Sequence, residues 1–200
     1  THYGTARNPY HLDHYPGGSS SGSAAAVAAG LCPIALGLDG GGSIRIPASL
    51  CGVVGLKTTW GRISSAGSAP LSWSLSTVGP ITSTVRDTAL AYSFMAGPDP
   101  RQVLTQDQPS VDLQDFDNSD LTGVRLGVFL PWFNHASEDI VQSCNQMLDS
   151  FKSLGATVQE IDIPDLDEIR MAHAVSLVTE LLTSLKTNFK PFRQPLGLDA

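Results

Sequence analysis

Two serine clusters in the first quarter of the chain carry the residue types that acyl-transfer chemistry requires. The first is Gly17-Gly18-Ser19-Ser20-Ser21-Gly22-Ser23, and the second is Asp39-Gly40-Gly41-Gly42-Ser43. A serine hydroxyl becomes a useful nucleophile when a neighbouring base removes its proton. Each cluster is therefore a candidate source of a nucleophilic serine.

The second cluster places three glycines directly before Ser43. Because glycine lacks a Cβ and tolerates positive φ, the amides of Gly40 to Gly42 could converge on one ligand oxygen. Such donors stabilise the oxyanion of an acyl-transfer intermediate, and losing one costs about 2.7–4 kcal/mol. An ion pair between Asp39 and Arg45 could hold the turn rigid. The alternative interpretation is an ordinary glycine-rich surface turn.

The first cluster has alternatives of its own. Ser20 or Ser21 could cap a helix of small residues over 23–29. Gly18 to Gly22 also matches the G-x-S-x-G nucleophile elbow, which requires a strand immediately before it. The preceding residues, 14–17, have no strand pattern.

Both clusters belong to a longer ordered pattern, and on that pattern the chain resembles the amidase signature family. The matching segments are Asn8-Pro9, Pro16-Gly17-Gly18-Ser19-Ser20, Ala24 to Gly30, Asp39-Gly40-Gly41-Gly42-Ser43-Ile44-Arg45-Ile46-Pro47, Gly52-Val53-Val54-Gly55-Leu56-Lys57-Thr58, Gly61-Arg62 and Val78-Gly79-Pro80. A gapped match of this length is far more specific than either cluster alone.

The resemblance implies a role for each serine. It assigns the nucleophile to Ser43 and the proton relay to Ser19, with a cis peptide between Gly18 and Ser19. Ser20 becomes a supporting hydrogen-bond residue. The family's oxyanion donors map onto the glycines at 40, 41 and 42, and neither a cofactor nor a metal is implied.

The family's chemistry also needs a buried neutral lysine, because desolvation lowers the pKa of an ammonium group. In family members that lysine lies upstream of the Gly-Gly-Ser-Ser stretch, and no lysine precedes Ser19 here. The nearest one, Lys57, matches a different family position and is interpreted as structural. The chain also begins without Met, inside a motif-dense loop. We therefore interpret it as an internal fragment, and we expect the isolated chain to be inactive.

Finer features resemble plant-type fatty acid amide hydrolases, which implies a small-molecule lipid amide such as an N-acylethanolamine as substrate. The features include Ala29-Gly30-Leu31-Cys32, Leu56-Lys57-Thr58-Thr59 and Trp132-Phe133-Asn134. Two other functions stay open: a non-catalytic amidase-like binding protein and a glutamine-dependent transamidation subunit. A peripheral membrane contact and a homodimer also stay open.

Composition excludes several function classes. The net charge of −7 is unfavourable for binding nucleic acid, which requires clustered Lys and Arg. Three cysteines without a C-x-x-C pair favour reduced thiols, and hence an intracellular protein of the cytoplasm or an endomembrane. The longest apolar run, Ala24 to Leu38, is interrupted by glycine and proline. The histidines, including His11, His14 and His173, lack a metal-site pattern and are interpreted as solvent-facing or core residues.

The elements that must position the serines follow from periodicity and from turn residues. They predict an α/β fold with a mixed sheet core flanked by helices, an incomplete amidase signature fold. The predicted portions are a catalytic core portion over 1–97, a linker or insertion over 98–120, and a β-α-β-α portion over 121–200. The predicted elements are a loop over 1–18, a helix over 23–29, a buried strand over 33–38, a helix over 44–50, a buried strand over 53–56, a surface loop over 61–80, a helix over 85–96, a strand over 125–130, a helix over 138–154, a strand over 157–163 and a helix over 166–186.

Overall fold

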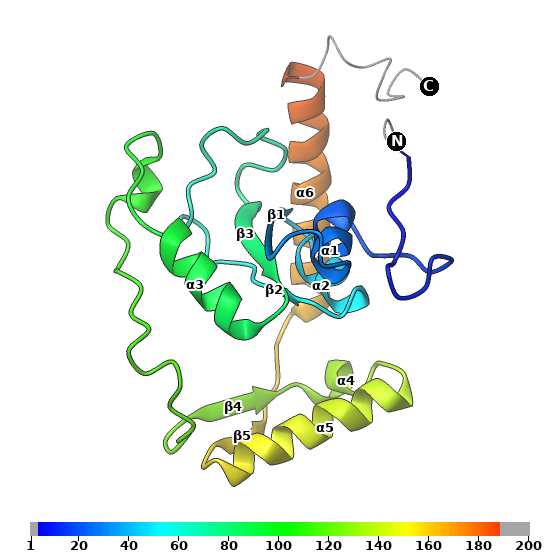
Figure 1. Cartoon of the computed structure of the whole chain (residues 1–200), viewed down its shortest axis with the longest axis vertical. Helices are drawn as coiled ribbons and strands as arrows, with labels where there is room; N and C mark the ends of the chain where they lie inside the picture. The colour runs from blue at the N-terminus through cyan, green and yellow to red at the C-terminus, as the bar shows by residue number, and fades with distance from the viewer. Residues whose placement is uncertain (1–3, 189–200) are drawn as a thin grey trace. The chain divides into compact units, whose positions relative to one another are not determined.

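The structure is a computed structural model that describes residues 4–188 (Figure 1). It divides into two compact units, which are described separately. One comprises Thr1–Asp112 with Ala172–Ala200, and the other comprises Leu113–Met171. The α/β class predicted from the sequence is confirmed. The division predicted at residues 97 and 120 stays a prediction.

The first unit is built on a three-stranded antiparallel sheet. Its order is β1 (Ile34–Asp39), β3 (Thr77–Thr82) and β2 (Val54–Gly55), so β3 is the central strand. β3 is buried along almost its whole length.

The sequence predicted a surface loop over 61–80, which is wrong for the first four residues of β3, Thr77 to Pro80. Glycine and proline disfavour strands, and this strand contains both Gly79 and Pro80. A Cβ at Gly79 would collide with the carbonyl oxygen of Leu56, so glycine is required there. Pro80 still contributes its carbonyl, which accepts a hydrogen bond from the Leu56 amide at 3.1 Å.

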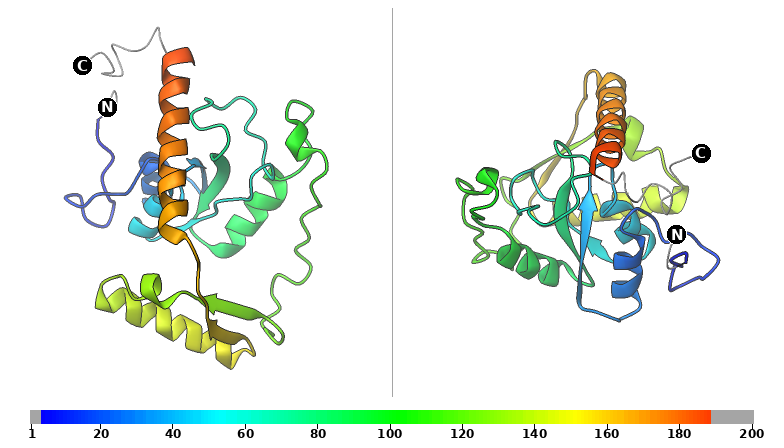
Figure 2. Two further views of the ribbon diagram at one scale, coloured as in Figure 1. Left: turned by 180° about the vertical axis from the view of Figure 1, so that it is seen from behind. Right: turned by 90° about the horizontal axis from the view of Figure 1, so that it is seen from above.

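Two helices cover opposite sides of this sheet, α1 (Ser21–Ala28) and α3 (Val85–Met95), as both views in Figure 2 show. Small residues let α1 approach closely, because alanine adds little width to a helix. The buried core that results comprises Ala24, Val27, Ile44, Cys51 and Ile81. The short helix α2 (Arg45–Leu50) begins just after the glycine turn and is flanked by two of these core residues, Ile44 and Cys51.

β1 is an edge strand of this sheet, and the expectation that it is buried is wrong. Ile34 is 44% exposed and Leu36 is 57% exposed, whereas Asp39 at its end is fully buried. Only β3 pairs with β1 among the described residues. The apolar pattern of β1 therefore predicted a strand correctly, but it did not predict that the strand lies at the edge of the sheet with apolar side chains exposed.

The segment after α3 is irregular, as predicted for 98–120, but a buried residue and hydrogen bonds fix its first part to the rest of the first unit. It contains the 3-10 helix η1 (Val103–Thr105), in which Thr105 is fully buried. The side chain of Gln102 accepts a hydrogen bond from the Ser65 amide at 2.6 Å.

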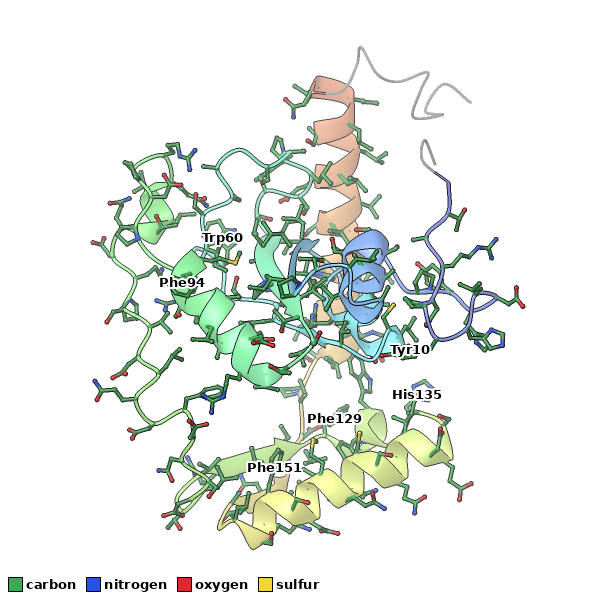
Figure 3. All side chains as sticks on the ribbon, viewed as in Figure 1. Tyr10, Trp60, Phe94, Phe129, His135 and Phe151 are labelled. Atoms are coloured by element: carbon green, nitrogen blue, oxygen red, sulfur yellow. The ribbon has the colours of Figure 1, made fainter. Side chains whose placement is uncertain are left out.

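The second unit is a β-α-β unit, as predicted. Strands β4 (Arg125–Val128) and β5 (Thr157–Glu160) are parallel and are connected through α4 (Leu130–Phe133) and α5 (Glu138–Ser153). Phe129 and Phe151, both labelled in Figure 3, line one apolar groove beside this sheet.

The last helix, α6 (Leu166–Asn188), begins in the second unit and continues in the first. The sequence predicted it over 166–186. No helix among residues 4–188 is both long enough and apolar enough to span a membrane.

Candidate active site

The glycine turn connects the end of β1 to the start of α2, and Asp39 organises it. The fully buried carboxylate accepts hydrogen bonds from the amides of Gly42 at 2.7 Å, Ile44 at 3.1 Å and Arg45 at 3.3 Å. It also accepts two from the Arg45 guanidinium, at 3.0 and 3.1 Å. The ion pair expected between Asp39 and Arg45 is therefore present.

These contacts keep Asp39 ionised. Burial by itself raises the pKa of the carboxyl group, but the Arg45 side chain and the three backbone amides outweigh it and lower the pKa to about 2. The turn is thus built around a permanent negative charge whose hydrogen-bonding capacity is used by the turn itself.

The three glycine amides expected as oxyanion donors differ in their hydrogen bonding. The amide of Gly42 donates to Asp39, and the residue is buried. Gly40 and Gly41 instead line the cavity described next. The amides of these two glycines are the ones that remain as candidate donors to a substrate oxygen.

Ser19 and Ser43 line the same cavity, which has a volume of about 300 Å³. The two serines come from different loops, one preceding α1 and one preceding α2. The loops are joined directly, because the amide of Ser20 donates to the carbonyl of Ser43 at 3.1 Å. The remaining lining residues are Leu38, Gly40, Gly41, Leu71, Ser72, Ser76, Leu177 and Leu181.

The loop before α1 has the cis peptide between Gly18 and Ser19 that the family resemblance implies. Gly17 adopts a positive φ of 84°, and a Cβ there would lie 2.5 Å from the Cα of Pro47. Ser20 connects this loop to β1, since its Oγ accepts a hydrogen bond from the Leu38 amide at 3.3 Å. Ser20 therefore contacts both segments that border the cavity, and its supporting role stays a prediction.

The two alternative interpretations of this loop are wrong. Neither Ser20 nor Ser21 caps α1 through its side chain, and the Ser21 hydroxyl donates to the carbonyl of Gly17 at 2.6 Å instead. No strand occurs between residues 4 and 20, so the loop is not a nucleophile elbow.

Sequence reasoning missed the contribution of α6 to the site. His173, interpreted as solvent-facing or core, has its Nε2 2.8 Å from the carbonyl oxygen of Gly40. Leu177 and Leu181 line the cavity one and two turns further on. The only signal in the sequence was the four-residue spacing of these positions, which places them on one helix face.

Glu180, on the same helix, holds the segment that contains Ser72 and Ser74, and Ser72 lines the cavity. Its carboxylate accepts hydrogen bonds from the Ser72 hydroxyl at 2.9 Å, the Ser74 amide at 3.0 Å and the Ser74 hydroxyl. The hydrogen bonds from the Ser74 hydroxyl and amide lower the pKa of Glu180 against the opposing effect of desolvation, and the bond from Ser72 adds to this lowering. The wall containing Ser72 is therefore attached to α6 by a charged group.

The remaining candidates lie outside this cavity. The Nζ of Lys57 donates to the Thr58 carbonyl at 3.1 Å, and Lys57 does not line the cavity. The rings of His11 and His14 lie 4.1 Å apart, centroid to centroid. Across residues 4–188, no group of three or more His, Cys, Asp or Glu residues could hold a metal ion.

The α/β scaffold of the first unit presents Ser19, Ser43 and two glycines of the turn to one cavity. Comparison with known proteins identifies the family to which this scaffold belongs. The family model described as Amidase matches residues 1–197. The chain belongs to the amidase family.

Curated proteins similar to this chain include fatty acid amide hydrolases and glutamyl-tRNA(Gln) amidotransferase subunits. The fatty acid amide hydrolase of Medicago truncatula is 46% identical over 197 residues, covering 95% of this chain and 32% of that protein. A glutamyl-tRNA(Gln) amidotransferase subunit from Nitratidesulfovibrio vulgaris is 42% identical, covering 92% of this chain and 38% of that protein. The chain spans about a third of the length of the curated relatives it matches.

Solved structures agree with this assignment. A glutamyl-tRNA(Gln) amidotransferase subunit from Thermotoga maritima matches 97% of this chain and 43% of that chain, with a TM-score of 0.84 and 34% identity. The peptide amidase of Stenotrophomonas maltophilia matches 94% of this chain and 39% of that chain, with a TM-score of 0.79 and 34% identity.

Proposed function

We propose that the protein containing this chain is an amidohydrolase that forms an acyl-enzyme on Ser43. The observation that carries the proposal is the shared cavity of Ser19 and Ser43, which Gly40 and Gly41 also line. A nucleophile, a proton relay and candidate oxyanion donors thereby border a single space.

In the proposed mechanism the Ser43 hydroxyl attacks the amide carbonyl carbon while its proton passes to Ser19. The C=O π electrons move to oxygen, where the amides of Gly40 and Gly41 stabilise the negative charge. The C–N bond then breaks as the relay returns a proton to the leaving nitrogen. Water hydrolyses the acyl ester on Ser43 by the reverse sequence of proton transfers.

The relay requires a base beyond Ser19, which the family resemblance identifies as a lysine preceding it. The first lysine of this chain is Lys57, which does not line the cavity. The proposal therefore assigns the base to a lysine outside these residues. The isolated 200-residue chain should show no amidase turnover.

We further propose that the substrates are fatty acid amides, such as N-acylethanolamines. Four leucines form the apolar part of the cavity wall, Leu38, Leu71, Leu177 and Leu181. Burying a methylene group contributes about 0.8 kcal/mol, so such a wall favours an acyl chain over a small polar acyl group. The similarity to plant fatty acid amide hydrolases, at 43–46% identity, supports the same substrate class.

A second candidate is a glutamine-dependent transamidation subunit. It is favoured by the match to the Thermotoga maritima protein, which has a TM-score of 0.84. The apolar cavity wall and the net charge of −7 argue against it, because glutamine is polar and tRNA is an anion. A non-catalytic amidase-like binding protein is the remaining alternative.

The test is turnover by the full-length protein on primary amides and N-acylethanolamines of increasing acyl length, with glutamine as the polar comparison. We expect kcat/KM to rise with acyl length. Hydrolysis of glutamine or acetamide without hydrolysis of long-chain amides would refute the lipid substrate. A fluorophosphonate probe should label Ser43, and failure to label it would refute the nucleophile and favour a binding protein.

A further inference from the structure

One face of α6 follows the border of the cavity. His173, Leu177 and Leu181 recur every four residues and are directed at the glycine turn and the cavity. A Cβ added at Gly41 would lie 3.0 Å from Leu177 and 3.9 Å from the His173 ring. The helix therefore packs directly against the residues whose amides are the candidate oxyanion donors.

The contact of His173 falls on a specific peptide unit. The carbonyl of Gly40 and the amide of Gly41 belong to the same planar peptide group. A carbonyl oxygen only accepts, so the Nε2–H of His173 is the donor in this 2.8 Å hydrogen bond. Fixing the carbonyl oxygen fixes the plane, and with it the direction of the Gly41 N–H.

This restraint matters because the turn consists of glycines, whose backbone has more accessible conformations than that of any other residue. Asp39 already fixes the next peptide, since its carboxylate accepts from the Gly42 amide at 2.7 Å. The peptide between Gly40 and Gly41 receives its corresponding anchor from His173, which lies 133 positions away in the sequence.

From this geometry we propose that His173 is a positioning residue that aims the Gly41 amide at the developing oxyanion. The inference rests on the proposed amidohydrolase function and adds a residue to its machinery. His173 does not line the cavity, so it acts through the peptide rather than on the substrate.

The experiment compares His173→Leu with His173→Gln in the full-length protein. Leucine removes the donor, whereas glutamine keeps an N–H at similar reach. An oxyanion donor that is mis-aimed is weakened in the transition state more than in substrate binding. We expect kcat of His173→Leu to fall by about tenfold with KM nearly unchanged, and His173→Gln to recover to within about threefold of the unsubstituted protein.

A spectroscopic measurement separates aiming from a general packing defect. The carbonyl stretch of the acyl-enzyme reports polarisation by the oxyanion donors, so it should move to higher wavenumber in His173→Leu and return in His173→Gln. The matched control is His14→Leu, at a histidine outside the cavity lining, which should leave kcat and the carbonyl band unchanged. An unshifted band or an unchanged kcat in His173→Leu overturns the inference, as does equal impairment of both variants.

A third measurement needs no turnover. Amide hydrogen exchange over residues 40–42 should accelerate in His173→Leu and slow again in His173→Gln, because the anchored peptide becomes mobile. Unchanged exchange overturns the positioning role whatever the catalytic result. Absence of Ser43 labelling and of hydrolysis in the unsubstituted protein would instead refute the proposed function, so the two failures are distinguishable.

Discussion

Two connections lead from a strand to a helix and satisfy the start of the helix differently: β1 connects to α2 directly, and β4 connects to α5 through the short helix α4. Between β1 and α2, the side chain of Asp39 accepts hydrogen bonds from backbone amides at the start of the helix, and it is fully buried. Between β4 and α5, Ser137 precedes the helix without a capping hydrogen bond from its side chain. α5 also contains no fully buried residue.

The acidic side chains of the two regions also differ in burial and in the number of their hydrogen bonds. The Asp39 carboxylate is 0% exposed and has five hydrogen bonds from the turn and α2, whereas Asp149 of α5 is 73% exposed and pairs only with Lys152. A buried charge must be fully satisfied, while an exposed one is solvated by water. The first connection therefore fixes backbone amides beside the cavity, and the second needs only an amphipathic pattern.

Substitutions in the two connections should differ in effect, and the largest effect, on kcat, is expected from Ser43→Ala in the full-length protein. Removing the nucleophile should lower kcat by about 10⁴-fold or more and abolish fluorophosphonate labelling. Ser143→Ala is the matched control, because the Ser143 hydroxyl donates only to a carbonyl of its own helix, α5. Residual turnover of Ser43→Ala near the unsubstituted rate would assign the nucleophile elsewhere.

The next largest effect is expected from Asp39→Ala, which leaves the buried amides of Gly42 and Ile44 without their acceptor. We expect the free energy of unfolding to fall by about 2–4 kcal/mol, measured by denaturant titration. Asp39→Asn keeps one acceptor oxygen and should lose less. If both variants were as stable as the unsubstituted protein, the turn would not depend on the buried charge.

A smaller effect with a defined pH dependence is expected from Glu180→Gln. The pKa of Glu180 is lowered from its ordinary value of 4.5, so ionisation stabilises the folded state above pH 4.5, and this contribution is lost as pH falls through the lowered pKa. The difference in Tm between Glu180→Gln and the unsubstituted protein should therefore be present at pH 7 and shrink toward zero below pH 4.5. A pH-independent difference in Tm would mean that the charge of Glu180 does not hold the segment containing Ser72 and Ser74.

The smallest effect is expected from Asp149→Ala, the exposed counterpart of the Asp39 substitution. An exposed i,i+3 pair contributes little, because water already solvates both charges. Tm should change by no more than about 1 °C. A loss comparable to that of Asp39→Ala would remove the distinction between the two connections.

Local signals in the sequence predicted most of the elements and pointed to two of the four serines that line the cavity, Ser19 and Ser43. The apolar spacing of α5 and α6 and the glycines before Ser43 are readable within a few residues. β3 was missed because Gly79 and Pro80 disfavour a strand locally, and only the close approach of Leu56 explains the glycine.

The engagement of the Gly42 amide and the contact of His173 with Gly40 were also beyond sequence reasoning. The first depends on which way a buried carboxylate points, and the second joins residues 133 positions apart. The neighbours of a residue across the fold are set by packing. Periodicity shows only which face of an element a residue occupies.

The sequence separation between α6 and the glycine turn has a consequence for synthesis. A growing chain exposes Ser19 and Ser43 on the ribosome more than a hundred residues before Leu177 and Glu180 are made. Contacts over such distances form late, because the intervening chain must first be ordered. Until α6 has emerged, the nascent polypeptide lacks one wall of its cavity, so the space that Ser19 and Ser43 line is completed only after this helix has docked.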